Sequence, residues 1–300
     1  MSTNVLAKSA TKIGGEIREF VWKWKNKDYP VVYETLGNGS PLLLLPAFST
    51  VSMREEMGGL AKLLSPYFQC VTVDWIGFGD SARPSLNYAP EIYQNFLADF
   101  VTSVFQTPIT VVAAGHSAGY VLRLAKENPS VFSRILLVAP TWRGPLPTMG
   151  VSRKGATVVK DIVRSPLLGQ LLYKLNSAPS FLKFMYRRHV YVDEAKLTRD
   201  FIHHKWENTQ KPGARFAPAA FVTGTLDPVQ KREELLSFVA DLPTPLMVVI
   251  GESSPPKSRA EMEALATLPG VGSVFLSGTL GMHEEYPQAI TEAVLSFLNS

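Results

Sequence analysis

One serine in this sequence lies in a pattern that can make it a nucleophile. Residues 115–119 read Gly-His-Ser-Ala-Gly, which is the pattern G-x-S-x-G, and its serine is Ser117. β-Branched residues at 109–112 predict a buried strand before the motif, and apolar residues at 121–125 predict a helix after it. Such a strand-to-helix turn strains the serine backbone and lifts its hydroxyl above the sheet. The pattern therefore predicts an exposed Ser117 hydroxyl that performs covalent catalysis, the alternative being a tight turn without chemistry.

The elements around this motif alternate along the chain. A hairpin-like pair of strands is expected at 16–25 and 29–36. Apolar runs predict further strands at 42–45, 69–75, 109–112, 134–139, 246–251 and 273–276. Helical patterns cover 53–64, 91–105, 121–125 and 259–268, and a last helix begins at Pro287. This order predicts an α/β fold, with a mostly parallel sheet covered by helices on both faces.

The alternation stops after Pro140 and resumes near residue 244. The intervening residues are rich in proline, glycine, basic and aromatic side chains, with helical stretches near 158–163, 167–175 and 181–186. We therefore expect residues 1–140 and 244–300 to form the core, and residues 141–243 to form a helical cap inserted between two strands.

Composition indicates a well-cored globular protein. Of 300 residues, 46% are hydrophobic and 19% are charged, which is typical of folded domains. Cys70 is the single cysteine and cannot form an internal disulfide, as in proteins of reducing compartments. No apolar run approaches a membrane span, and no signal-peptide pattern is present. These features predict a cytoplasmic protein.

Positive charge is concentrated in the cap. Residues 141–220 contain fourteen Lys/Arg and five Asp/Glu, a balance of +9 against +4 for the whole chain. No nucleic-acid recognition module accompanies this charge, so we expect no nucleic acid partner. The cap also carries large apolar residues, namely Trp142, Leu167, Leu168, Leu171, Leu172, Tyr173, Phe181, Phe184, Met185 and Tyr186. Either these side chains roof an apolar active site, or the cap makes peripheral contact with an anionic membrane.

Three motifs stand in register with a known family. They are the serine turn, the loop from Asp74 to Ser81, and the Glu-Glu-Tyr-Pro sequence that leads into the last helix. Outside the cap, nearly the whole chain resembles the cap-bearing serine esterases and lipases of the α/β-hydrolase fold superfamily. This resemblance implies Ser117 as the nucleophile and the N–H groups of Ala118 and Phe48 as oxyanion donors.

The other two members of the implied triad depart from the family pattern. The family's Gly-x-x-Asp reads Gly-Glu-Ser-Ser here, with Ser254 in place of the aspartate, so Glu252 and Asp227 are the candidate acids. The family's Gly-His falls at residues 279–280, which are Thr-Leu. His283 is therefore the candidate base, the alternative being a solvent-facing histidine beside Glu284.

The first functional hypothesis is a serine hydrolase that forms an acyl-enzyme on Ser117. Its substrate would be a small carboxylic ester with a hydrophobic acyl or alcohol part. Two alternatives remain open: a non-catalytic binding protein that has lost the standard acid and histidine, and a lyase or cofactor-free oxidoreductase on the same fold. No cofactor is expected, and no metal either, because His189, His203 and His204 lack the spacing of a metal site.

Overall fold

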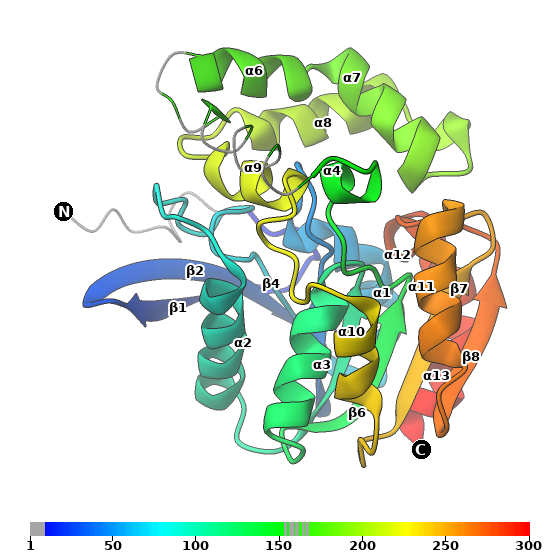
Figure 1. The fold of residues 1–300 in the computed structure, drawn as a ribbon. Coiled ribbons are helices and arrows are strands. Elements are labelled where there is room, and N and C mark those ends of the chain that lie inside the picture. The colour runs from blue at the N-terminus through cyan, green and yellow to red at the C-terminus, as the bar shows by residue number, and fades with distance from the viewer. Residues whose placement is uncertain (1–9, 153–154, 156–158, 160–161, 164, 166–167) are drawn as a thin grey trace.

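A single eight-stranded sheet forms the centre of the computed structural model (Figure 1), which describes residues 10–300 except 153–154, 156–158, 160–161, 164 and 166–167. The strands are β1 (Glu16–Trp24), β2 (Lys27–Leu36), β3 (Ser40–Leu45), β4 (Phe68–Val73), β5 (Ile109–Ala114), β6 (Phe132–Val138), β7 (Leu246–Gly251) and β8 (Val271–Leu276). Their order across the sheet is β1-β2-β4-β3-β5-β6-β7-β8. The β1–β2 and β2–β4 pairs are antiparallel, and all other pairs are parallel. The predicted mostly parallel sheet is confirmed.

The central strands are apolar along their whole length. Every residue of β5 is buried, and β3 ends in four buried leucines, Leu42 to Leu45. Strands buried on both faces carry continuous apolar runs of this kind, because neither face meets water. β1 lies at the edge and has a mixture of exposed and partly buried residues instead.

Helices cover both faces of the sheet. α1 (Gly58–Leu64) packs against α13 (Pro287–Asn299) on one face. Figure 1 shows four helices in a row on the other face, namely α2 (Pro90–Val104), α3 (Ser117–Glu127), α10 (Arg232–Val239) and α11 (Pro256–Ala266). α10 lies within the segment that the sequence assigns to the cap, yet it packs against α3 and α11. None of the described helices is long and apolar enough to cross a membrane.

The remaining helices of the insertion lie over one edge of the sheet, at the top of Figure 1. They are α4 (Pro145–Thr148), α6 (Leu168–Asn176), α7 (Pro179–Met185), η3 (Tyr186–Val190), η4 (Glu194–Lys196), α8 (Arg199–Thr209) and α9 (Phe216–Val222). Most of the helix expected at 158–163, as well as Leu167, lies outside the described residues. Two short core helices lie at the same edge as these elements, η2 (Arg54–Met57) and α12 (Met282–Glu285).

A buried arginine attaches η2 to the sheet. Arg54 Nε lies 3.1 Å from Glu34 Oε2, and Nη1 lies 2.8 Å from Asp80 Oδ2 and also contacts Asp74. Nη2 donates to the Ala10 carbonyl at 2.7 Å. Burial lowers the pKa of the guanidinium, but the carboxylates outweigh this effect and the pKa is raised. Arg54 therefore stays charged inside the protein.

Glu34 anchors the N-terminal segment to this arginine. Its carboxylate accepts backbone N–H bonds from Lys12 and Gly15 at 2.8 Å and from Ile13 at 3.1 Å. Burial alone would raise the pKa of Glu34, but these donors and Arg54 lower it below its ordinary value. The folded state thus favours the ionised carboxylate.

Acid should destabilise the fold through this network. Glu34 and Asp80 both have pKa values lowered from the ordinary values of 4.5 and 3.8, respectively. Their contribution to stability is full above these ordinary values and is lost as pH falls through the lowered folded values. Each unit of lowering corresponds to about 1.4 kcal/mol. Urea unfolding followed by tryptophan fluorescence should show this loss, and Glu34→Gln should flatten the pH dependence. Glu16→Gln, which alters an exposed pair with Arg18, should leave the dependence unchanged.

Candidate active site

Ser117 lies at the edge of the sheet where the parallel strands end. It is the first residue of α3 and is separated from β5 only by Gly115 and His116. Gly115 has a φ of +52°, a left-handed conformation that favours glycine. A Cβ at this position would lie 2.9 Å from the Cβ of Ala47. The first glycine of the motif therefore allows both the sharp turn and the close approach of the neighbouring loop.

The Ser117 hydroxyl is buried, so the expected exposure is wrong. Ser117 is 0% exposed, and its Oγ donates a hydrogen bond of 2.5 Å to the carbonyl of Pro46, which directly follows β3. The expected backbone strain at the serine is also missing: among described residues other than glycine, positive φ occurs only at Lys25, Asn26, Ala139 and Asp241. Before Oγ can attack a substrate, the bond to Pro46 must break.

The two candidate oxyanion donors come from the residue after this serine and from the loop that follows β3. The N–H of Ala118 donates to Gly115 O at 3.3 Å, which is long for such a bond. The N–H of Phe48 donates to no backbone carbonyl among the described residues. The centroid of the Phe48 ring lies 4.8 Å from that of Trp75 and 5.5 Å from that of Tyr120. An oxyanion could compete for the weakly bonded Ala118 donor, while packing of the Phe48 side chain holds the second donor in place.

His283 is buried beside a carboxylate, so it is not solvent-facing. It belongs to α12, is 3% exposed, and its Nε2 lies 3.6 Å from Glu56 Oε2 of η2. Neither ring nitrogen of His283 has a hydrogen-bond partner among the described residues, so the 3.6 Å contact with Glu56 is longer than a hydrogen bond. A buried histidine beside a carboxylate can serve as a general base once this contact shortens to a hydrogen bond. Sequence reasoning did not identify Glu56, which precedes His283 by more than two hundred residues.

A lysine of the cap shares this carboxylate. Lys205 of α8 is buried, and its Nζ lies 3.5 Å from Glu56 Oε1 and 2.7 Å from Glu284 Oε1. Burial lowers the pKa of Lys205, but Glu284, Tyr186 and Glu56 raise it, and the net shift is strongly upward. The charged lysine of α8 therefore joins the cap to η2, which carries Glu56, and to α12, which carries His283 and Glu284.

The two acids that the sequence suggested do not contact His283. Asp227 is buried, but its Oδ1 lies 3.3 Å from His116 Nε2 and accepts the N–H of Gly144 at 2.8 Å. Glu252 is exposed, and its carbonyl accepts from Arg259 at 3.0 Å. Asp227 thus lies beside the histidine that precedes Ser117, and Glu252 lies at the surface.

The positions where the related family has its acid and histidine contain other side chains. Ser254 is buried, and its Oγ has no hydrogen-bond partner among the described residues. Leu280 is half-buried against the core. On either side of Leu280, the Thr279 hydroxyl and the Gly281 N–H both donate to the carbonyl of Val190 in the cap. The cap therefore bonds directly to the loop that carries the histidine in that family.

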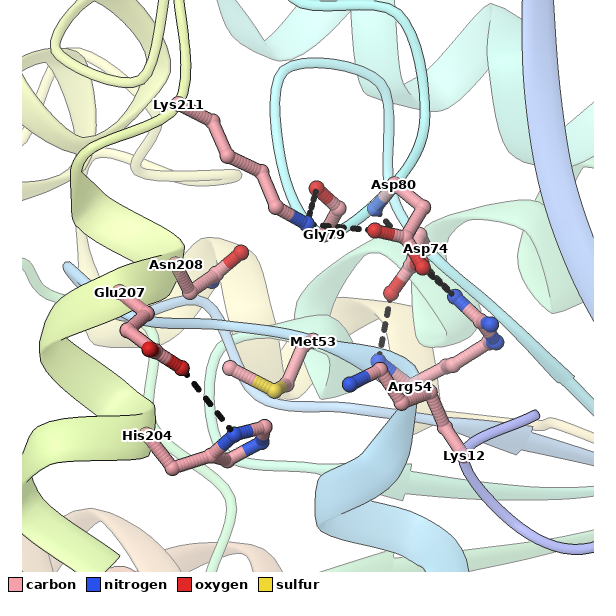
Figure 2. Close-up of a pocket in the computed structure, with 10 residues that line it drawn as sticks. All are labelled: Lys12, Met53, Arg54, Asp74, Gly79, Asp80, His204, Glu207, Asn208 and Lys211. Atoms are coloured by element: carbon pink, nitrogen blue, oxygen red, sulfur yellow. Dashed lines mark hydrogen bonds and ion pairs between the residues drawn. The ribbon is translucent and has the colours of Figure 1, made fainter. Parts of the chain in front are cut away.

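A small cavity separates α8 of the cap from the loop after β4 (Figure 2). Its volume is about 90 Å³, and its lining is Lys12, Met53, Arg54, Asp74, Gly79, Asp80, His204, Glu207, Asn208 and Lys211. Most of the lining residues carry polar or charged groups, and Ser117 is not among them, so this cavity does not test the apolar pocket that we expect around the serine. Its charged groups pair with one another, as when Lys211 contacts Asp80. No group of three His, Cys, Asp or Glu side chains among the described residues is placed to hold a metal ion.

Sequence comparison places most of the chain in one family profile. Residues 42–293 match the profile described as the alpha/beta hydrolase family. An uncharacterized protein of Mycobacterium bovis is 23% identical over 111 residues, which make up 37% of this chain and 32% of that protein. An uncharacterized protein of Mycobacterium tuberculosis gives the same values. The chain thus spans about a third of the length of the curated relatives it matches.

Solved structures share the fold over nearly the whole chain. A thermophilic esterase from Thermogutta terrifontis has a TM-score of 0.72 at 18% identity, covering 95% of this chain and 98% of its own. The haloalkane dehalogenase DatA from Agrobacterium tumefaciens has a TM-score of 0.73 at 16% identity, and the match covers 97% of this chain and 99% of the dehalogenase. A bromoperoxidase from Bacillus anthracis has a TM-score of 0.71 at 16% identity, and the match covers 94% of this chain and 100% of the bromoperoxidase. At these identities the likeness shows the fold alone.

Removal of the Ser117 hydroxyl should cost stability as well as any chemistry. Ser117→Ala removes one of two donors to the buried Pro46 carbonyl, the other being Trp75 Nε1 at 3.0 Å, so we expect the free energy of unfolding to fall by about 0.5–1.5 kcal/mol. Ser52→Ala is the matched control, because Ser52 is buried and its hydroxyl has no hydrogen-bond partner among the described residues. Denaturant unfolding should find this control neutral or slightly stabilised. Equal stabilities of Ser117→Ala and wild type would contradict the structural role of the bond.

Proposed function

This chain belongs to the alpha/beta hydrolase family, and on that premise we propose that it is a serine hydrolase that cleaves carboxylic esters. Membership of the family suggests hydrolase activity, and the assignment of ester chemistry to Ser117 is our inference. The main support is the buried pair formed by His283 and Glu56. The pair lies at the sheet edge that carries Ser117, because β3, β5 and β8 are parallel and each precedes one of these residues.

In the proposed reaction, Ser117 Oγ attacks the ester carbonyl and His283 accepts its proton. Glu56 stabilises the imidazolium that forms, taking the role that an aspartate after β7 has in the family. His283 then returns the proton to the leaving alcohol, and an acyl-enzyme remains on Ser117. Water then attacks the acyl carbonyl while His283 accepts its proton, and His283 returns that proton to Ser117 Oγ as the acid is released. The Ala118 and Phe48 N–H groups stabilise the oxyanion in both steps.

The surroundings of Ser117 favour a hydrophobic substrate. Phe48 lies in van der Waals range of Trp75 and Phe78, and its ring lies 6.3 Å from that of His116. Phe221 of the cap helix α9 approaches the same histidine at 5.3 Å. Aromatic side chains from both core and cap thus surround His116, the residue directly before Ser117. An apolar acyl or alcohol part fits this lining better than a charged one.

A second candidate is a non-catalytic binding protein on the same fold. The bond from Ser117 to the Pro46 carbonyl favours it, because a carbonyl cannot accept the serine proton for catalysis. The helical, unstrained serine backbone favours it too, since strain is a feature of functional turns. Leu280 and Ser254 stand where the family has its histidine and its aspartate. Under this candidate, Glu56 and Glu284 would only hold Lys205 of the cap, and His283 would be a buried structural residue.

Active-site labelling separates the two candidates. We expect a fluorophosphonate probe to modify the wild type at Ser117, as located by peptide mass spectrometry, and a short p-nitrophenyl ester to be hydrolysed. Ser117→Ala should lose both activities. If the wild type, shown to be folded by circular dichroism, neither reacts with the probe nor turns over any of a chain-length series of esters, the hydrolase assignment fails.

The identity of the base and of the acid is tested by substitution. His283→Ala should reduce turnover by about 10² or more, as loss of a general base does, and Glu56→Gln should reduce it by less. Glu252→Gln and Asp227→Asn are the matched controls and should retain activity. If His283→Ala has no effect while Leu280→His raises turnover, the family's histidine position is vacant and His283 is structural.

A further inference from the structure

Helix α6 has its apolar stripe on the outside of the molecule. Leu168, Leu171, Leu172 and Leu175 recur at the spacing of one helix face, and all four are exposed, Leu171 at 56% and Leu175 at 61%. The buried residues of this helix are Gly169 and Tyr173. An amphipathic helix on a globular domain normally turns such a stripe toward the core. The stripe of α6 therefore has no partner among the described residues.

Helix α7 extends the same surface. Phe181 and Phe184 are exposed, with ring centroids 6.4 Å apart, whereas Leu182 between them is buried. Figure 1 shows α6 and α7 one after the other along the top of the cap. We call the six exposed side chains, Leu168, Leu171, Leu172, Leu175, Phe181 and Phe184, the cap ridge. Large apolar side chains gathered in this way indicate an interaction surface rather than scattered exposure.

The chain segment that contains the cap ridge carries charge of one sign. Residues 168–192 contain Lys174, Lys183, Arg187 and Arg188 and no aspartate or glutamate. Lys174 and Lys183 lie on α6 and α7 themselves and are exposed. Arg187 pairs at the surface with Glu194 at 3.4 Å. Exposed lysines thus accompany the apolar side chains on the two helices that form the ridge.

We propose that the cap ridge binds the surface of an anionic lipid bilayer. Leucine and phenylalanine side chains would enter the boundary between headgroups and acyl chains, while Lys174 and Lys183 meet the lipid phosphates. An opposing protein copy fits the surface less well. A two-fold interface places the same patch against itself, so the four cations of residues 168–192 would face their own copies. This lipid contact does not depend on the hydrolase assignment, because no residue of the ridge belongs to the candidate active site.

Vesicle co-sedimentation tests this surface with the chain of 300 residues. We expect the wild type to pellet with phosphatidylglycerol vesicles at low salt, less at high salt, and weakly with phosphatidylcholine vesicles. Lys174→Gln with Lys183→Gln should weaken binding to phosphatidylglycerol about 30-fold, since each cation contributes about a factor of five. Leu171→Gln with Leu175→Gln should remove binding at both salt concentrations. Ser117→Ala should bind as the wild type does.

The matched control is Tyr67→Gln, which removes an apolar side chain that is 52% exposed on the core. It should bind like the wild type, and circular dichroism should show every variant folded. Wild-type protein that stays in the supernatant with phosphatidylglycerol vesicles at low salt would overturn the proposal. So would binding that survives both double substitutions. A dimer in size-exclusion chromatography that only Leu171→Gln with Leu175→Gln abolishes, without vesicle binding, would instead assign the ridge to a second copy.

Discussion

The buried guanidinium of Arg54 is the interaction on which the rest of the site depends. It binds carboxylates from β2 and from the loop after β4, and thereby fixes the short helix η2 at the sheet edge. η2 carries Glu55, which binds His204 of the cap at 2.6 Å, and Glu56, which faces His283. A buried ion pair adds little net stability, but loss of one partner leaves uncompensated charge. The position of both the candidate acid and the cap therefore follows from one arginine.

Most of the scaffold could be predicted from the sequence because its signals are local. The apolar runs that became β3, β5 and β7 identify strands covered on both faces, and their alternation with helices implies parallel pairing. Pro287 marks the start of α13 because proline fits the first helical turn. Gly115 to Gly119 gave the position of the serine. Each of these features depends on a few adjacent residues.

The contacts within the site could not be predicted, because they join distant parts of the chain. The residues near Glu56 do not indicate that His283 lies beside it. The sequence around Asp227 likewise does not predict its contact with His116. The prediction of an exposed serine hydroxyl was wrong because the hydroxyl donates a hydrogen bond to the Pro46 carbonyl, seventy-one residues away. The helical pattern near residues 167–175 likewise did not show whether the leucines of α6 face the core or the solvent. A pattern tells which residues share a face, but the neighbours determine whether that face is covered.

The charges that join cap and core have a consequence for the kinetics of this protein. Lys205 is buried between Glu56 and Glu284, so separating α8 from η2 and α12 would expose three charged groups in one step. Such a separation is cooperative, because a half-open state would leave a buried charge unpaired. A reagent that must pass beneath the cap would then react at a rate that stops rising with reagent concentration. That plateau would equal the frequency with which the cap lifts, whatever the chemistry at Ser117.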